Sequence, residues 1–124
     1  MKTPTVLLVF EELRDLETYG SILRSSGYGT RMCTSVAEGI EALETEDISI
    51  VILDQGTPAF EGRQVLVRSL QLRPEVPVLV IARTLDMHCY LEAMDLGAID
   101  YLEKPDRQDM LWVLDTQMRR GAFA

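Results

Sequence analysis

The sequence predicts an α/β protein with a five-stranded parallel sheet that helices cover on both faces. Short apolar runs alternate with helix-length amphipathic segments along the whole chain, which is the order of a repeated βα unit with right-handed crossovers. Three of the runs are continuously apolar, and such runs are typical of parallel strands buried on both faces. These runs are Val6–Val9, Ile50–Leu53 and Val78–Ile81.

Each predicted strand is short, and all but the second are rich in β-branched or aromatic residues. In chain order the predicted strands are Thr5–Phe10, Gly29–Cys33, Ser49–Leu53, Val76–Ile81 and Ile99–Leu102.

The predicted helices carry apolar residues at helical spacing and have recognisable ends. Ser35, followed three residues later by Glu38, forms a capping box at the start of the second helix. Gly27 and Gly97 suit the ends of the first and fourth helices. In chain order the predicted helices are Glu12–Ser26, Ser35–Thr45, Gly62–Leu72, Thr84–Leu96 and Asp106–Arg119.

Size and charge restrict the classes of function. A chain of 124 residues with 47% apolar and 26% charged residues has the size and composition of one ordinary domain, so we expect a single domain over residues 1–124. The net charge of −8 argues against direct nucleic-acid binding, which needs clustered Lys and Arg. No apolar run approaches the roughly 18 residues of a membrane span, so we expect no membrane association.

The cysteines and the single histidine do not suggest a metal site. Cys33 and Cys89 lie far apart in the sequence. His88 and Cys89 are neighbours on a predicted helix, where adjacent side chains point in different directions. We therefore expect buried or half-buried free thiols and a cytoplasmic protein, because a reducing cytoplasm preserves thiols.

Polar residues follow three of the predicted strands, at the edge where doubly wound sheets place their functional crevice. These residues are the pair Glu11-Glu12, Asp54, and Lys104 before Pro105. Carboxylates that converge need a cation, and Mg²⁺ accepts one or two carboxylates with carbonyls and waters. An aspartate beside Mg²⁺ and lysine is a plausible phosphoryl acceptor.

Four segments in order resemble the receiver domains of bacterial two-component response regulators. The run Val51–Pro58, closed by Gly62, resembles the phospho-acceptor strand and loop. Ser26–Tyr28 resembles the turn after the family's first helix, and Pro77–Ile81 resembles its fourth strand. Gly97–Pro105 resembles its fifth strand with the lysine-proline end. The resemblance covers nearly the whole chain and implies a flavodoxin-like (βα)5 fold with strand order 2-1-3-4-5.

The resemblance also implies a chemistry. Asp54 would be the phospho-acceptor, with Mg²⁺-dependent phosphoryl transfer from a histidine kinase or a phosphotransfer protein. Glu11, Asp54 and the backbone carbonyl of Gly56 would bind Mg²⁺, and Glu12 is a further candidate ligand. Lys104 would pair with the phosphoryl group, and its bond to Pro105 would be a candidate cis peptide.

The resemblance further implies an output surface. Tyr101 would be the aromatic switch residue, and the face of the fourth helix, fifth strand and fifth helix would carry signalling and a possible homodimer. Apolar residues of Thr84–Leu96 fall on more than one helical face, and Trp112 lies opposite the apolar stripe of its helix. Such a surplus suits a protein interface, although extra core packing is an alternative.

Two positions depart from the family pattern. The family usually ends its first strand with two acidic residues, and an ungapped count back from Gly27 places Phe10 and Glu11 there. A shift by one residue would place Glu11 and Glu12 there instead, but it spoils the placement of Ile22 and Leu23, so we prefer the ungapped count. Phe10 would remove one carboxylate, add bulk beside the metal and weaken Mg²⁺ binding. Ala82 takes the position of the usual Ser or Thr, so a hydrogen bond worth about 1.5–3 kcal/mol to a charged group is lost. Arg83 is an alternative anion contact.

Three interpretations remain open from the sequence. The first is a receiver that accepts a phosphoryl group on Asp54. The second is a degenerate receiver that acts as a phosphorylation-independent protein-interaction module. The third, an unrelated small α/β enzyme, is disfavoured because the sequence has no nucleophile elbow, glycine-rich phosphate loop or histidine base near a strand end. We therefore do not predict an enzyme.

Overall fold

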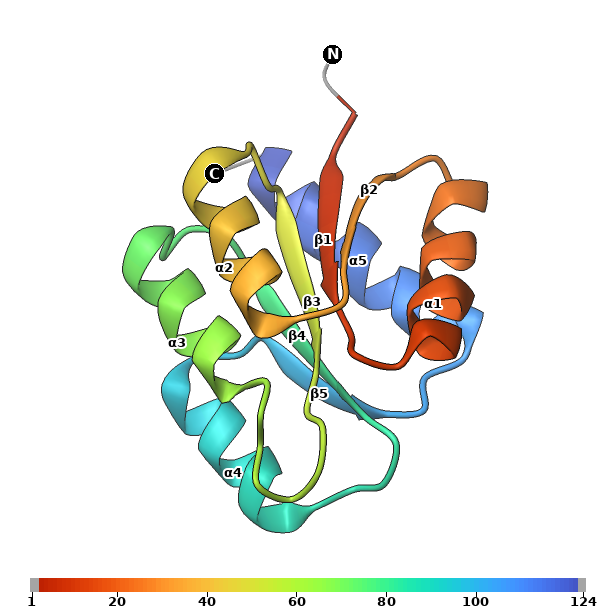
Figure 1. Cartoon of the computed structure of the whole chain (residues 1–124). Helices are drawn as coiled ribbons and strands as arrows, with labels where there is room; N and C mark the ends of the chain where they lie inside the picture. Colours follow the sequence, from red (N-terminus) through yellow and green to blue (C-terminus); the bar gives the residue numbers. More distant parts are fainter. Residues whose placement is uncertain (1–2, 123–124) are drawn as a thin grey trace.

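The computed structural model of the chain describes residues 3–122, so the first two and last two residues of the predicted domain lie outside it. Strands and helices alternate throughout the described chain, as the apolar runs predict (Figure 1). The elements are β1 (Thr5–Val9), α1 (Leu13–Ser25), β2 (Gly29–Cys33), α2 (Val36–Thr45), β3 (Ile50–Asp54), α3 (Arg63–Leu72), β4 (Val78–Ala82), α4 (Met87–Leu96), β5 (Asp100–Glu103) and α5 (Arg107–Ala122).

The strands form one parallel sheet in the order β2-β1-β3-β4-β5, which confirms the predicted flavodoxin-like topology. Val9 at the end of β1 pairs with Leu53, and Asp54 at the end of β3 pairs with Ile81. This register brings the carboxyl ends of the central strands to one edge of the sheet, at the bottom of Figure 1. The residues that follow these strands therefore meet there.

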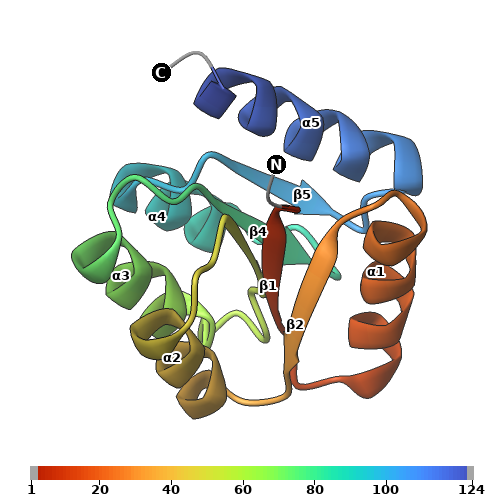
Figure 2. The ribbon, with the colours of Figure 1, turned by 90° about the horizontal axis from the view of Figure 1, so that it is seen from above.

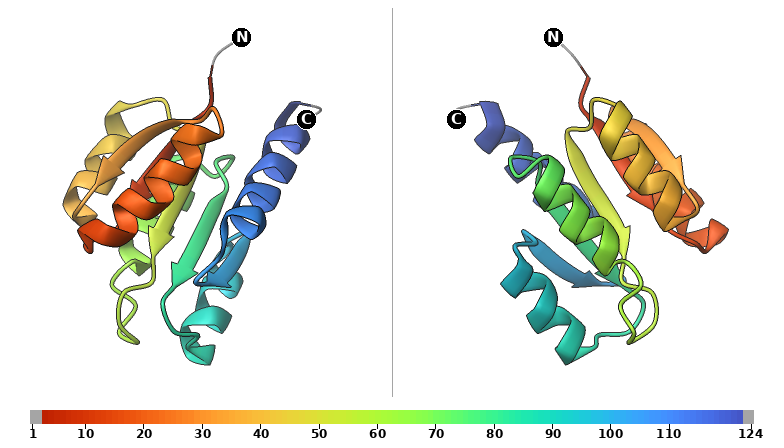
Figure 3. Two further views of the ribbon diagram at one scale, coloured as in Figure 1. Left: turned by 90° about the vertical axis from the view of Figure 1, so that its right-hand side faces the viewer. Right: turned by 60° about the vertical axis from the view of Figure 1, so that its left-hand side comes forward.

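Helices cover both faces of the sheet. Helices α1 and α5 pack on one face and α2, α3 and α4 on the other, as Figures 2 and 3 show. Along β1, Val6 and Leu8 face the first layer, whereas Leu7 and Val9 face the second, which is the two-residue period of a strand. Burial on both faces explains why the central strands are continuously apolar.

Two element boundaries differ from the prediction by three residues: α4 begins at Met87 rather than Thr84, and α5 ends at Ala122 rather than Arg119. Asp86 is the N-cap, and its side chain accepts a hydrogen bond of 2.9 Å from the Cys89 N–H. The preceding backbone is held by other elements, because the Leu85 N–H donates to Glu103 at 2.9 Å. The predicted start of α4 was wrong because the hydrogen bond to Glu103 on β5 and the N-cap at Asp86 place the first helical residue at Met87.

The predicted helix ends are otherwise confirmed where they were most specific. The Ser35 hydroxyl accepts a hydrogen bond of 3.1 Å from the Glu38 N–H at the start of α2, as a capping box requires. Gly97 ends α4 with φ of 118°, a left-handed conformation that glycine adopts without steric cost.

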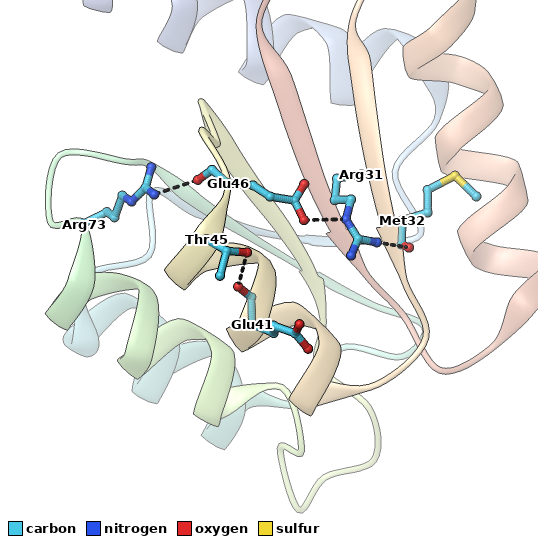
Figure 4. A network of polar contacts seen from close by, with 6 residues as sticks. All are labelled: Arg31, Met32, Glu41, Thr45, Glu46 and Arg73. Atoms are coloured by element: carbon cyan, nitrogen blue, oxygen red, sulfur yellow. Dashed lines mark hydrogen bonds and ion pairs between the residues drawn. The ribbon is translucent and has the colours of Figure 1, made fainter.

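A polar network closes the end of α2 (Figure 4). Arg31 of β2 donates to the Glu46 carboxylate at 2.8 Å, and Arg73, which follows α3, donates to the Glu46 carbonyl at 2.6 Å. The Thr45 hydroxyl donates back to the Glu41 carbonyl at 2.9 Å. Glu46 therefore joins three elements of the face covered by α2, α3 and α4, away from the carboxyl edge of the sheet.

Two expectations from composition can be compared with the described residues. Cys33 and Cys89 are both buried free thiols, as predicted. Over residues 3–122, none of the helices combines the length and the apolar character needed to cross a membrane.

Candidate functional site

A cavity of about 450 Å³ opens at the carboxyl edge of the sheet. It is lined by the ends of β1 and β3, by the loop between β3 and α3, and by the residue after β4. The polar and glycine residues at its wall that matter for its chemistry are Glu11, Glu12, Asp54, Gly56, Glu61 and Arg83. The cavity thus brings together all the acidic residues that the sequence proposed for this edge.

Asp54 is half-buried at the end of β3. Burial raises the pKa of its carboxyl above the ordinary value of 3.8, and the negative charge of Asp15 raises the pKa further. A hydrogen bond from the Gly56 backbone and the positive charge of Arg83 oppose these effects and lower it. The ionised form of Asp54 is therefore destabilised by its surroundings, which suits a group that gains from a nearby cation.

Asp54→Asn is expected to stabilise the folded protein near neutral pH, because it removes a carboxylate whose ionised form is unfavourable in the folded state. The folded-state pKa lies above the unfolded one, so the folded state binds more protons between the two values. Wild-type stability must then fall as pH rises through that interval, relative to the variant. Free energies of unfolding of both proteins, measured from about pH 3 to pH 8, test this, and a difference that is independent of pH contradicts it.

Arg83 places a positive charge over the acidic cavity. Its Nε donates to Asp15 Oδ2 at 2.8 Å, and its Nη2 lies 3.9 Å from Glu12 Oε2. Both partners belong to the beginning of α1. The Arg83 side chain is exposed, so these pairs contribute little to stability, but they hold a cation close to the acids. Arg83, which the sequence suggested as an alternative anion contact, is thus present in the cavity wall and already paired.

The loop after β3 contributes an acid that sequence reasoning missed. Glu61 accepts hydrogen bonds from both the hydroxyl and the backbone N–H of Thr57, at 2.6 Å and 3.0 Å. These bonds lower the pKa of Glu61. The Glu61 carboxylate thus links the two ends of this loop segment. The spacing of Thr57 and Glu61 in the sequence does not reveal the contact, because a solvated glutamate would have the same spacing.

Phe10 does not lie where the sequence analysis expected. Its side chain is 1% exposed and belongs to the core beneath α1 and α5. Its ring centroid lies 5.3 Å from that of Tyr19. Phe10 is not among the residues that line the cavity, so the expectation that it adds bulk beside the metal was wrong. The strand-end register turns its side chain toward the face opposite that of Val9.

The residues after β4 and β5 are placed differently from one another. Ala82 is fully buried at the end of β4, and its carbonyl accepts a hydrogen bond of 2.9 Å from the Lys104 N–H. The Lys104 side chain is exposed and does not line the cavity. The bond from Lys104 to Pro105 is trans, which corrects the expected cis peptide, and the chain turns at Lys104 itself with φ of 40°. The role of Lys104 stays a prediction.

The residues present fit a Mg²⁺ ion. Glu11, Asp54 and Gly56 line one cavity, and Mg²⁺ commonly takes one or two carboxylates, a carbonyl and several waters. Within residues 3–122 no group of three or more His, Cys, Asp or Glu side chains is arranged to hold a metal ion. A Mg²⁺ ion bound here would therefore take many of its ligands from water and the backbone, and the weakened affinity expected from Phe10 stays a prediction.

Tyr101 lies inward, beside the residue that follows Asp54. Its side chain is 6% exposed, and its hydroxyl donates to Oε1 of Gln55, which is itself 2% exposed. The ring packs edge-on against Tyr90, with centroids 5.5 Å apart. Sequence reasoning missed Gln55, because a polar residue just beyond a strand end is ordinarily solvent-exposed and nothing in the sequence marks this one as buried.

The proposed output surface carries exposed apolar side chains. Leu85, Met87 and Leu91 near the start of α4 are 48%, 58% and 57% exposed, and Trp112 of α5 is 66% exposed. Extra core packing, the alternative, accounts for other residues of the same helix, because Cys89 and others contact the core. The apolar surplus of α4 and α5 therefore divides between the two interpretations: some residues pack into the core, and these four are largely exposed.

Comparisons with known proteins agree with this architecture. The sequence model of the response regulator receiver domain matches residues 6–115, and the chain belongs to this family. It is similar to the transcriptional regulatory protein FixJ of Bradyrhizobium diazoefficiens, with 31% identity over 73% of this chain and 44% of that protein. It is also similar to the aerobic respiration control protein ArcA of Escherichia coli, with 31% identity over 85% of this chain and 44% of that protein.

Solved structures share the fold. The signal receiver domain of an HD domain-containing protein from Pseudomonas fluorescens superposes with a TM-score of 0.90 at 22% identity, over 99% of this chain and 100% of that one. The beryllofluoride-activated NtrC4 receiver domain dimer gives 0.83 at 21% identity, over 94% and 97%. The chain spans less than half the length of the curated regulators FixJ and ArcA.

Proposed function

We propose that this receiver domain accepts a phosphoryl group on Asp54 from the phosphohistidine of a histidine kinase or phosphotransfer protein. The observation that carries the proposal is the shared cavity at the carboxyl edge of the sheet, where Asp54 lies with Glu11 and Gly56. Asp54 is held at the end of the central strand, which fixes its backbone while its side chain reaches the cavity.

In the proposed transfer, a carboxylate oxygen of Asp54 forms the new bond to phosphorus. The bond between phosphorus and the histidine nitrogen breaks, and its electron pair stays on that nitrogen. Bound Mg²⁺, held by Glu11, Asp54 and the Gly56 carbonyl, would offset the negative charge that gathers on the phosphoryl oxygens. Arg83 adds a second positive charge near the same place, and Lys104 would contribute only after its exposed side chain turns into the cavity.

A second candidate is a phosphorylation-independent protein-interaction module. The observation that favours it is the hydrogen bonding of the switch aromatic, because Ala82 supplies no hydroxyl and Tyr101 is already paired with Gln55. In both candidates we propose that the chain signals through the α4-β5-α5 face, where a partner or a second copy in a homodimer would bind. Both place the protein in the cytoplasm, with no nucleic acid as a direct partner.

Titration with beryllofluoride and Mg²⁺ tests the first candidate, since beryllofluoride mimics a phosphoryl group on an aspartate. Amide signals of residues 54–57 should shift in a saturable manner, and Trp112 fluorescence reports on the α4-β5-α5 face. Asp54→Asn, which keeps the side-chain volume and removes the acceptor oxygen's charge, should abolish the response. A wild-type protein that does not respond at millimolar Mg²⁺ would instead support the second candidate.

A further inference from the structure

The side-chain amide of Gln55 is buried between two elements and satisfied on both sides. Its Oε1 accepts the hydrogen bond from the Tyr101 hydroxyl, and its Nε2 lies 3.4 Å from the Thr57 carbonyl. The Gln55 backbone N–H donates to the Ile81 carbonyl at 2.8 Å. Gln55 is thus anchored to β4 by its backbone, while its amide bridges the loop after Asp54 and the ring on β5.

The Tyr101 hydroxyl extends this bridge to α4. It accepts a hydrogen bond of 3.1 Å from the backbone N–H of Asp86, and Asp86 is the N-cap of that helix. The hydroxyl therefore uses its donor toward Gln55 and its acceptor toward Asp86. A continuous path of hydrogen bonds runs from the residue next to Asp54 to the first turn of α4.

We propose that Gln55 is a positioning residue that holds Tyr101 inward and fixes the start of α4 without any modification of Asp54. The proposal rests on the proposed function in one respect, because it takes the α4 side as the output surface. The exposed apolar side chains of that surface follow directly from the fixed segment, since Leu85 and Met87 flank Asp86. The hydrogen-bond path therefore holds this surface in one arrangement in the unmodified protein.

Gln55 can determine the position of Tyr101 because the hydrogen bond between them is buried. A hydroxyl that loses a partner in a buried place must find another or remain unsatisfied, which costs about 1–3 kcal/mol. Ala82, at the end of the neighbouring strand, offers no side-chain group for a hydrogen bond. Water at the surface is the remaining partner, so removal of the Gln55 amide favours an outward Tyr101 and frees the Asp86 N–H.

Amide hydrogen exchange of the Asp86 N–H in the unmodified, Mg²⁺-free protein measures this directly. Gln55→Leu keeps a similar volume and removes the amide, and Tyr101→Phe keeps the ring and removes the hydroxyl. Each variant is expected to speed exchange at Asp86 about tenfold. The double variant should exchange no faster than Tyr101→Phe alone, because both changes break one path.

Gln64→Leu is the matched control, because Gln64 is exposed on α3 and lies outside the path. It should leave exchange at Asp86 unchanged. Unaltered exchange in Gln55→Leu, or fully additive effects in the double variant, would overturn the proposal. If Gln55→Leu folds poorly, Tyr101→Phe still tests the proposal. Unaltered exchange of the Asp86 N–H in Tyr101→Phe would show that the Tyr101 hydroxyl does not hold the start of α4. The test needs no acceptor activity, so its outcome is independent of the beryllofluoride titration.

Discussion

Gly62→Ala is expected to lower the free energy of unfolding by about 3 kcal/mol or more. A Cβ atom at Gly62 would lie 2.1 Å from the Asp54 carbonyl oxygen and 2.7 Å from a methyl carbon of Leu53. The carbonyl belongs to β3, which is hydrogen-bonded to a strand on each side. The clash can therefore be removed only by moving either the central strand or the loop that contains Gly62. Both contribute residues to the wall of the cavity.

Chemical denaturation gives the stability loss, and amide signals of residues 53–57 report the displacement of Asp54. Gly29→Ala is the matched control, because a Cβ atom there would lie 3.4 Å from its nearest neighbours, an ordinary contact. Its cost should stay below about 1 kcal/mol. Equal losses of unfolding free energy in Gly62→Ala and Gly29→Ala would show that the close approach of Gly62 to the Asp54 carbonyl does not determine the cost of a side chain at position 62.

The strand pattern made the fold and the position of Asp54 predictable from the sequence. A continuously apolar run such as Ile50–Leu53 has few alternatives to a strand buried on both faces, and an aspartate directly after it must lie at the sheet edge. The resemblance added the strand order, which local pattern does not contain. Both were confirmed for the described chain.

Contacts between distant elements were not predictable from the sequence in the same way. Arg83 pairs with Asp15, which lies 68 residues earlier, and Tyr101 bonds to Gln55 across 46 residues. Such pairs depend on side-chain direction at strand ends, where a change of one residue turns a side chain to the other face. Phe10 shows the same limit: counting residues back from Gly27 placed it at the end of the first strand, but did not reveal which face of the sheet its side chain occupies.

Phe10→Asp is expected to lose about 3–5 kcal/mol of stability without divalent ions. The ring is 1% exposed and packs on Tyr19, so its removal leaves an apolar space that aspartate does not fill. The new carboxylate is unfavourable in that space. A change of backbone conformation after β1 that turned it to the opposite side would bring it to the cavity that Glu11 and Asp54 line. The variant should consequently bind Mg²⁺ more tightly than the wild type.

Phe10→Ala separates the two effects, because it removes the same ring and adds no carboxylate. Both variants should be destabilised without Mg²⁺, and only Phe10→Asp should regain stability as Mg²⁺ is added. The recovery follows mass action and reaches about 1.4 kcal/mol when free Mg²⁺ is near ten times its Kd. If Mg²⁺ stabilises both variants equally, the missing acid at position 10 does not weaken the metal site.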